Sequence, residues 1–192
     1  MILKVLQNPE KKKKEDFSKM IKECNRLTNI KEEFSQEIFE IICMSKKDFT
    51  KLRELVKEGV DINSKDPLIE EFVPIIAAAQ HKKIELLEEL IDLGANVNIT
   101  DSEGRNCLML LIANGINQDK IIEIMDKIID RIDIKHKDKQ GCSVLTYAIG
   151  NGNKKIVDKL LDLNLEITDV DYAFASTKYL SNVIEKYEKI KL

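Results

Sequence analysis

Apolar and polar residues alternate most regularly between Val73 and Thr100. Pro74 opens this stretch at a position where the first turn of a helix needs no N–H, and three alanines favour a helix after it. A second predicted helix follows a polar link, and its apolar face holds Ile84, Leu86, Leu87, Leu90 and Ile91. Gly94 suits the left-handed end of this helix, so the stretch predicts two helices followed by an extended segment.

The same pattern recurs along the chain. A valine or isoleucine of the extended segment stands at positions 62, 97, 134 and 167, which are 35, 37 and 33 residues apart. The turn Asp101-x-x-Gly104 returns as Asp138-x-x-Gly141, 37 residues later. Units of about 33 residues with a β-turn and two helices are the ankyrin pattern. Over residues 34–168, the chain therefore resembles the ankyrin-repeat proteins.

This resemblance implies an all-α fold, an α-solenoid in which helix-turn-helix units stack and β-hairpin-like turns join them. We expect four repeats, at about residues 34–66, 67–100, 101–137 and 138–168. Residues 1–33 are interpreted as an N-terminal leader and a capping helix, and 169–192 as a C-terminal capping helix or a partial fifth repeat. The apolar stripe of the first cap is expected to be core: Phe17, Met20, Ile21, Cys24 and Leu27.

The chain also departs from the family pattern. The Thr-Pro-Leu-His segment of the family keeps its proline in one copy, at Pro74, and its histidine in none. In the family this threonine and histidine tie neighbouring turns together, so we expect a less regular array. Two connections look long, the hairpin at 66–72 and the inter-helix loop at 113–119, and the loop is a second candidate contact site.

Composition narrows the class of protein. The 192 residues are 43% hydrophobic and 34% charged, with a formal net charge of −3 that implies no bulk attraction to nucleic acid. No apolar run approaches the roughly 20 residues of a membrane span, and Met1–Leu6 lacks the pattern of a secretion signal. The four cysteines form no C-x-x-C pair. A reducing, intracellular and therefore cytoplasmic setting is the prediction.

Residues for catalysis are scarce. The two histidines, His81 and His136, lie in polar segments beside lysines, with no orienting partner in view. The chain has no phosphate-binding loop, no serine-hydrolase elbow and no cysteine or histidine pattern with zinc spacing. We therefore predict no enzyme, no cofactor and no metal site.

Binding is the better-founded hypothesis. In the family, protein partners usually dock on the concave surface formed by hairpin tips and the exposed side of the inner helices. The matching positions here are Glu70, Phe72, Gln80, His81, Ser102, Glu103, Arg105, Asn114, Lys139, Gln140, Cys142 and Asn151. Phe72 and Arg105 are the expected anchors because aromatic residues and arginine dominate interface energetics. The alternatives are a packed hairpin residue for Phe72 and a solvated turn residue for Arg105.

Three functions remain open at this point. The leading one is a non-catalytic module that binds a protein partner, as a regulator in its own cell or as an effector in a host. A second is a structural element that self-associates end to end, although the polar character of both ends favours a monomer. A third is binding of nucleic acid or an anionic surface through Lys11–Lys14, which otherwise belong to a solvated leader.

Overall fold

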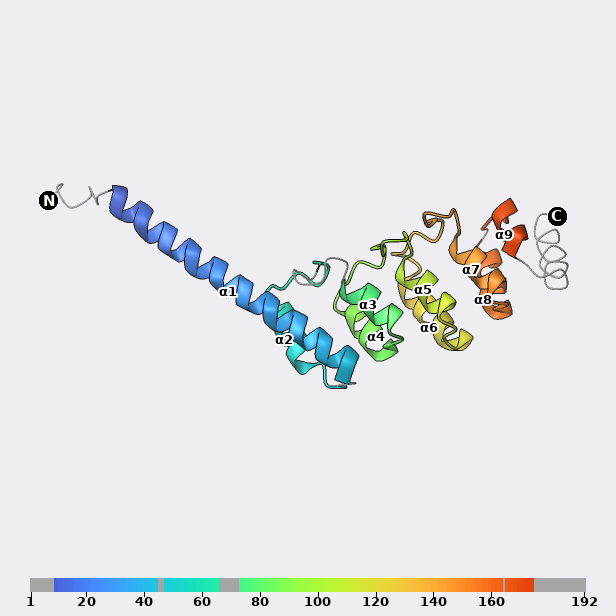
Figure 1. Cartoon of the computed structure of the whole chain (residues 1–192), viewed down its shortest axis with the longest axis horizontal. Coiled ribbons are helices and arrows are strands. Elements are labelled where there is room, and N and C mark those ends of the chain that lie inside the picture. Colours follow the sequence, from blue (N-terminus) through green and yellow to red (C-terminus); the bar gives the residue numbers. More distant parts are fainter. Residues whose placement is uncertain (1–8, 45–46, 66–72, 164, 175–192) are drawn as a thin grey trace. The chain divides into compact units, whose positions relative to one another are not determined.

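The computed structural model describes residues 9–44, 47–65, 73–163 and 165–174 (Figure 1). Helices make up the regular structure of these residues, together with two isolated β-bridges. The chain divides into two compact units, Met1–Asp61 and Ile62–Leu192, which are described in turn. Among the described helices, none combines the length and the apolar character needed to cross a bilayer.

The first unit consists of a long helix and a short one that pack on each other, α1 (Pro9–Met44) and α2 (Thr50–Lys57). The carboxylate of Asp48 accepts hydrogen bonds from the backbone N–H and the hydroxyl of Thr50, and thereby holds the start of α2. The buried apolar side chains of this unit include Ile30, Phe34, Ile38, Ile41, Ile42, Leu52 and Leu55.

The helix α1 differs in three respects from what the sequence pattern predicts for this N-terminal region. The predicted break between a capping helix and the first repeat, near residue 33, falls inside α1, which runs unbroken for 36 residues. It holds no internal glycine or proline that would end a helix. Lys11–Lys14 belong to α1 rather than to a leader that precedes the helix. The stripe predicted as core is exposed at Met20, which is 55% accessible. The side chains of its other members, Phe17, Ile21, Cys24 and Leu27, lie outside what the structure describes.

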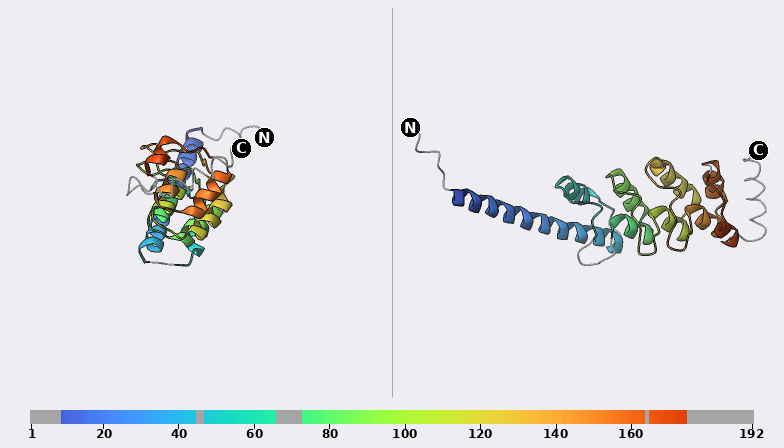
Figure 2. Two further views of the ribbon diagram at one scale, coloured as in Figure 1. Left: turned by 90° about the vertical axis from the view of Figure 1, so that its right-hand side faces the viewer. Right: turned by 90° about the horizontal axis from the view of Figure 1, so that it is seen from above.

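The second unit is a series of short helix pairs that follow one another along the chain (Figures 1 and 2). The inner helices are packed each against the next, and each of the first three is also packed against its outer partner. The prediction of an all-α solenoid is confirmed. The inner helices are α3 (Pro74–Gln80), α5 (Cys107–Ala113), α7 (Val144–Gly150) and α9 (Asp169–Phe174), and the outer helices are α4 (Ile84–Asp92), α6 (Gln118–Ile128) and α8 (Lys154–Asp162).

Inner and outer helices differ in what they bury. Every side chain of α5 from Cys107 to Ile112 is buried, because this helix has neighbours on several sides. The outer helix α4 buries only one face, made of Leu86, Leu87, Leu90 and Ile91. The core of the unit therefore lies between the two layers, as the apolar pattern predicts.

Two hairpin-like turns precede α5 and α7. Antiparallel bridges close them, at Thr100 with Asn106 and at Lys137 with Ser143. Gly104 at the tip of the first turn has a φ of +82°, and a Cβ there would lie 3.1 Å from the backbone N of Lys139 in the next turn. Glycine thus supplies both the left-handed conformation and the close approach.

The connections between helices partly differ from the prediction. Residues 113–119 are not one long loop, because α5 continues to Ala113 and α6 begins at Gln118, with the side chain of Asn117 as its N-cap. The predicted fifth unit begins as a helix at Asp169. The hairpin at 66–72 and the C-terminal capping segment from residue 175 onward lie outside the described residues.

Candidate functional site

The predicted contact positions fall into three groups. Glu70 and Phe72 lie outside the described residues, so the expected anchor at Phe72 stays a prediction. Arg105 and Asn114 are half-buried, and Cys142 is buried at 5% exposure. The remaining positions are exposed: Gln80, His81, Ser102, Glu103, Lys139, Gln140 and Asn151.

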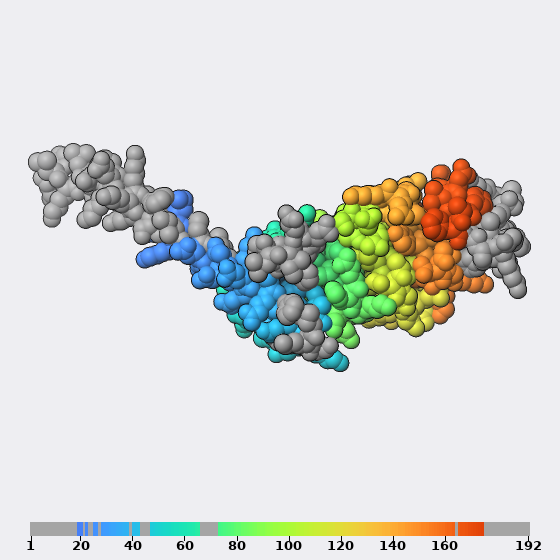
Figure 3. All heavy atoms as spheres, in the orientation of Figure 1, coloured from blue at the N-terminus to red at the C-terminus, as the bar shows by residue number. Residues whose placement is uncertain are grey.

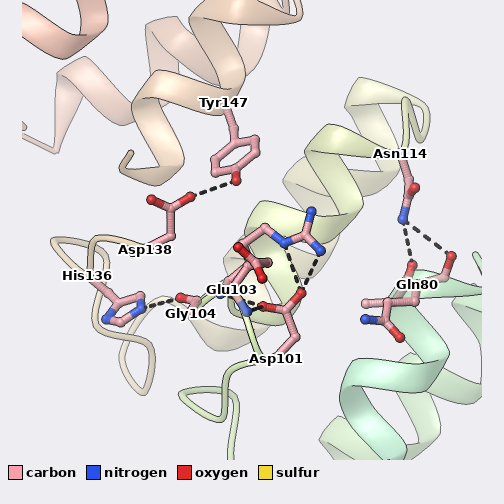
Figure 4. A network of polar contacts seen from close by, with 10 residues as sticks. Gln80, Asp101, Glu103, Gly104, Asn114, His136, Asp138 and Tyr147 are labelled. Atoms are coloured by element: carbon pink, nitrogen blue, oxygen red, sulfur yellow. Dashed lines mark hydrogen bonds and ion pairs between the residues drawn. The ribbon is translucent and has the colours of Figure 1, made fainter. Parts of the chain in front are cut away.

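Arg105 is bound within its own hairpin. Its Nε and terminal nitrogen lie 2.9 and 2.7 Å from Oδ2 of Asp101, whose side chain is only 5% exposed (Figure 4). The hydrogen bond from Arg105 to this carboxylate raises the pKa of the guanidinium. Asp101 Oδ1 also accepts the backbone N–H groups of Glu103 and Arg105. Arg105 therefore stiffens its hairpin, a role that the sequence analysis did not assign to it.

Asn114 joins two repeats. Its Nδ2 donates to the carbonyl oxygens of Ala79 and Gln80 at the end of α3, at 3.1 and 3.4 Å (Figure 4). The carbonyl of Ala79 also accepts the backbone N–H of Lys82, so Asn114 adds a second partner there. The predicted contact residue thus has a structural role in the array.

Hydrogen bonds to backbone carbonyl oxygens also join successive hairpins. His136 Nε2 lies 2.7 Å from the carbonyl oxygen of Gly104 (Figure 4). The backbone N–H of Lys139 donates to the carbonyl oxygen of Glu103 at 3.0 Å. Below them, the Asn98 side chain bonds to the carbonyl of Arg131 and the N–H of Asp133. The hairpin tips are therefore a connected surface rather than independent loops.

A pocket of about 270 Å³ lies on the inner-helix side of the array. Its walls come from three successive repeats, with Gln140, Cys142 and Asn151 among the predicted contact positions. Its other lining residues were not among the predicted contact positions: Ala113, Thr146, Tyr147, Gly150 and Phe174. Phe174 of α9 is 53% exposed, and α9 lies at the surface beside α7 (Figure 3).

Asp138 holds one side of this pocket. Its Oδ1 accepts the N–H groups of Gln140 and Cys142, both at 2.9 Å. Its Oδ2 accepts a hydrogen bond from the phenol of Tyr147 at 2.8 Å (Figure 4). Burial and this hydrogen bond raise the pKa of Tyr147. The Asp138 side chain is 8% exposed, and no ion pair to it is found within the described ranges.

Asp171 of α9 is fully buried and is bonded to the pocket residue Thr146. It accepts hydrogen bonds from the hydroxyl of Thr146 at 2.5 Å and from the N–H and hydroxyl of Thr168 at 2.7 and 2.8 Å. Thr146 also forms a capping box with Ser143 at the start of α7. Ser143 and Thr146 occupy the threonine and histidine positions of the family segment, so here the tie to the next unit runs through a carboxylate.

The outer helices carry a ladder of ion pairs between repeats. Lys120 and Lys127 of α6 lie 3.0 and 3.4 Å from the Glu88 carboxylate of α4. Lys155 and Lys159 of α8 pair with Asp119 and Asp126 of α6. Burial raises the pKa of Glu88, but its two lysines lower that pKa by more, so the net shift is downward. Charges on this face are thus largely satisfied within the chain.

Groups that could bind a metal ion do not gather in the part of the chain that the structure describes. It holds no cluster of three histidine, cysteine, aspartate or glutamate residues placed to bind a metal ion. Burial raises the pKa of the Cys107 thiol to about 12, so this thiol is not a nucleophile near neutral pH.

The comparisons agree with the repeat organisation. A family model described as "Ankyrin repeats (3 copies)" matches the chain over residues 39–138 and again over 75–171. These ranges cover more than half of the chain and include every helix pair of the second unit. No curated protein matches it.

Proposed function

The chain belongs to the ankyrin-repeat family, and we propose that it binds one protein partner through the hairpin tips and inner helices of its second unit. Ankyrin repeats are generally protein–protein interaction modules and are typically non-catalytic. Our proposal adds the face of the array and the residues that act there.

The outer and inner faces of the array differ in how their polar groups are paired, and this difference supports placing the binding site on the inner face. The outer helices pair their charges across repeats, as in Glu88 with Lys120 and Asp119 with Lys155. The inner face instead has a pocket with exposed polar groups at its rim, Gln140 and Asn151, and an exposed aromatic ring, Phe174. Aromatic residues in a recess are the common anchors of protein interfaces.

The pocket changes which residues we expect to dominate binding. Tyr147 and Phe174 replace Arg105 as anchors, because Arg105 is held by Asp101 while both rings line the pocket. The exposed positions Gln80, His81, Ser102, Glu103 and Lys139 extend the proposed surface along the array.

We place this binding inside a cell. Cys107 and Cys142 are free thiols and are both buried, which suits a reducing compartment. A regulator acting in its own cell and an effector acting in a host cell would both use the same face.

Site-directed photocrosslinking tests the proposal. Gln140 and Asn151 are each replaced by a benzophenone amino acid, and Glu123, exposed on the outer helix α6, serves as the matched control. The protein is then irradiated in lysate of its source organism. We expect one protein to be crosslinked from positions 140 and 151, to be displaced by excess unmodified chain, and to be missing at position 123. Crosslinking of a specific partner from position 123 alone would contradict the proposal.

A further inference from the structure

The pocket lined by Tyr147 and Phe174 has a chemistry that selects among side chains of a partner. We infer that it takes one basic side chain, a lysine or an arginine, of the bound protein. This inference rests on the proposed function, because it uses the same face and assumes a protein partner. It adds the chemical class of the group that is recognised.

The size of the pocket fits a single side chain. Its volume of about 270 Å³ is below the roughly 300–1,000 Å³ of sites for small molecules and cofactors. Ala113 and Gly150 are among its smallest lining residues, and they leave space above the helices. A Cβ at position 150 would lie 3.7 Å from Cδ1 of Phe174, so the lack of a side chain there helps to keep the recess open.

Two aromatic rings line this recess. A cation is attracted to the face of such a ring by its quadrupole. The phenol of Tyr147 donates to Asp138 at 2.8 Å, and this contact with a carboxylate polarises the ring and makes it more electron-rich. The long aliphatic stem of a lysine or arginine can also cover the apolar part of the pocket.

Two buried carboxylates next to the pocket supply the charge. Asp138 and Asp171 are 8% and 0% exposed, and each accepts three hydrogen bonds from neutral donors. Within the described residues, neither has a lysine or arginine in ion-pair contact, unlike Asp101 with Arg105. Four of their partners, Gln140, Cys142, Thr146 and Tyr147, line the pocket, whereas Thr168, which donates two of the bonds to Asp171, does not.

Their negative charge reaches the pocket wall. After burial itself, the charges of Asp138 and Asp171 are the causes that raise the pKa of the Cys142 thiol. Buried charges act through a medium of low dielectric constant, where their attraction for a cation is much stronger than in water. A basic side chain from a partner would supply the positive charge that these two carboxylates lack.

The positive groups nearby do not reverse this field. Arg105 is neutralised by Asp101, and Lys139 is exposed at the hairpin tip, where water and salt screen its charge. An acidic guest would meet both buried carboxylates and is disfavoured. A neutral side chain of the same shape would keep the packing in the pocket but lose the charge interaction. The test therefore compares a charged probe with a neutral one.

The experiment is a titration of the ¹⁵N-labelled full chain, followed by NMR. The probe is Nα-acetyl-arginine amide, and its neutral control is Nα-acetyl-citrulline amide, which has nearly the same shape. We expect the arginine derivative to shift the amide signals of Gln140, Gly150 and Asn151 saturably, and to bind at least tenfold more tightly than the citrulline derivative. Probe shifts equal for both compounds, or the absence of saturable shifts with arginine, would overturn the inference.

Variants locate the binding. Tyr147→Leu and Phe174→Leu, made separately, should each weaken binding of the arginine probe severalfold. Tyr172→Leu, on the same helix as Phe174, should leave this binding unchanged, because Tyr172 is exposed and does not line the pocket. Circular dichroism checks that each variant is folded. Arginine binding that survives both pocket substitutions would place it elsewhere and overturn the inference.

Photocrosslinking from positions 140 and 151 tests the proposed function separately. A crosslinked partner without arginine binding would therefore leave the proposed function standing.

Discussion

Tyr147 on α7 donates a hydrogen bond to Asp138 in the preceding hairpin, at 2.8 Å, and so fixes the turn against the helix that follows it. Tyr147→Phe keeps the ring and removes the hydroxyl, which leaves one oxygen of a nearly buried carboxylate without its partner. We expect a loss of about 0.5–1.5 kcal/mol in the free energy of unfolding, measured by urea denaturation near pH 7. An unchanged midpoint and slope would show that water replaces the hydroxyl without cost.

The same hydroxyl predicts a pH dependence. The pKa of Tyr147 is higher in the folded chain than its usual value near 10, so its contribution to stability is complete below pH 10 and declines as the pH rises above that. The stability difference between the wild type and Tyr147→Phe should therefore shrink as the pH rises from about 10 to about 11. The comparison with the variant removes the contributions of lysines and other tyrosines. A difference that grows over this range would contradict the direction of the shift.

Asp171 is expected to hold the last described helix in place. Asp171→Asn replaces one acceptor oxygen by an amide donor, which then stands opposite either the Thr146 hydroxyl or both donors of Thr168 in a buried site. Because repeats contact only their neighbours, the damage should stay local. Hydrogen exchange of the Asp171–Phe174 amides should accelerate at least tenfold, while α4 stays protected. Asp169→Asn, at an exposed position of α9, is the control and should leave exchange nearly unchanged.

Leu90 tests the core of the most regular unit. It is fully buried on α4, and Leu90→Ala should cost about 2–5 kcal/mol in the free energy of unfolding by leaving a cavity. Leu93→Ala, at a half-buried position just after the same helix, should cost clearly less. Chemical denaturation that gives less than about 1 kcal/mol for Leu90→Ala would mean that the site collapses around the smaller side chain.

The ion-pair ladder should add little stability. Glu88→Gln removes the shared partner of Lys120 and Lys127, which are exposed enough for solvent screening, so we expect less than about 1 kcal/mol. The pKa of Glu88 is lowered in the folded chain, so its contribution is present above its usual value near 4.5 and is lost as the pH falls through the folded value. The difference from the wild type, measured in urea, should shrink with added salt and at acidic pH. A larger effect in high salt would rule out an electrostatic origin.

The sequence predicts the parts of this molecule that rest on local pattern. Gly94 and Gly104 mark turn positions with positive φ, and the apolar face around Leu90 is the buried face of α4. The absence of an internal glycine or proline also indicates that α1 is one unbroken helix. The repeat spacing instead predicted a boundary near residue 33, inside this helix. Where one pattern conflicted with another, the absence of a helix breaker was the better guide.

The candidate site was predictable only in part, because its geometry depends on residues far apart in sequence. Asn114 bonds to carbonyls 34 and 35 residues away, and nothing local distinguishes it from a surface amide. The pocket combines Ala113, Tyr147 and Phe174 from three repeats, so no single repeat carries its signal. Arg105 was assigned to a partner because composition favours arginine at interfaces, whereas its spacing of four residues from Asp101 indicated the intramolecular pair.

The most direct test of the central claim fills the pocket and measures partner binding. Gly150→Leu places a large side chain in the recess at a position whose backbone needs no positive φ, and Gly150→Ala, with a Cβ in ordinary contact with Phe174, is the matched control. The yield of the partner crosslinked from position 151 is then compared between the two variants. We expect at least a tenfold loss of yield for Gly150→Leu and little change for Gly150→Ala. An undiminished yield in a correctly folded Gly150→Leu variant would show that the partner does not bind in this pocket.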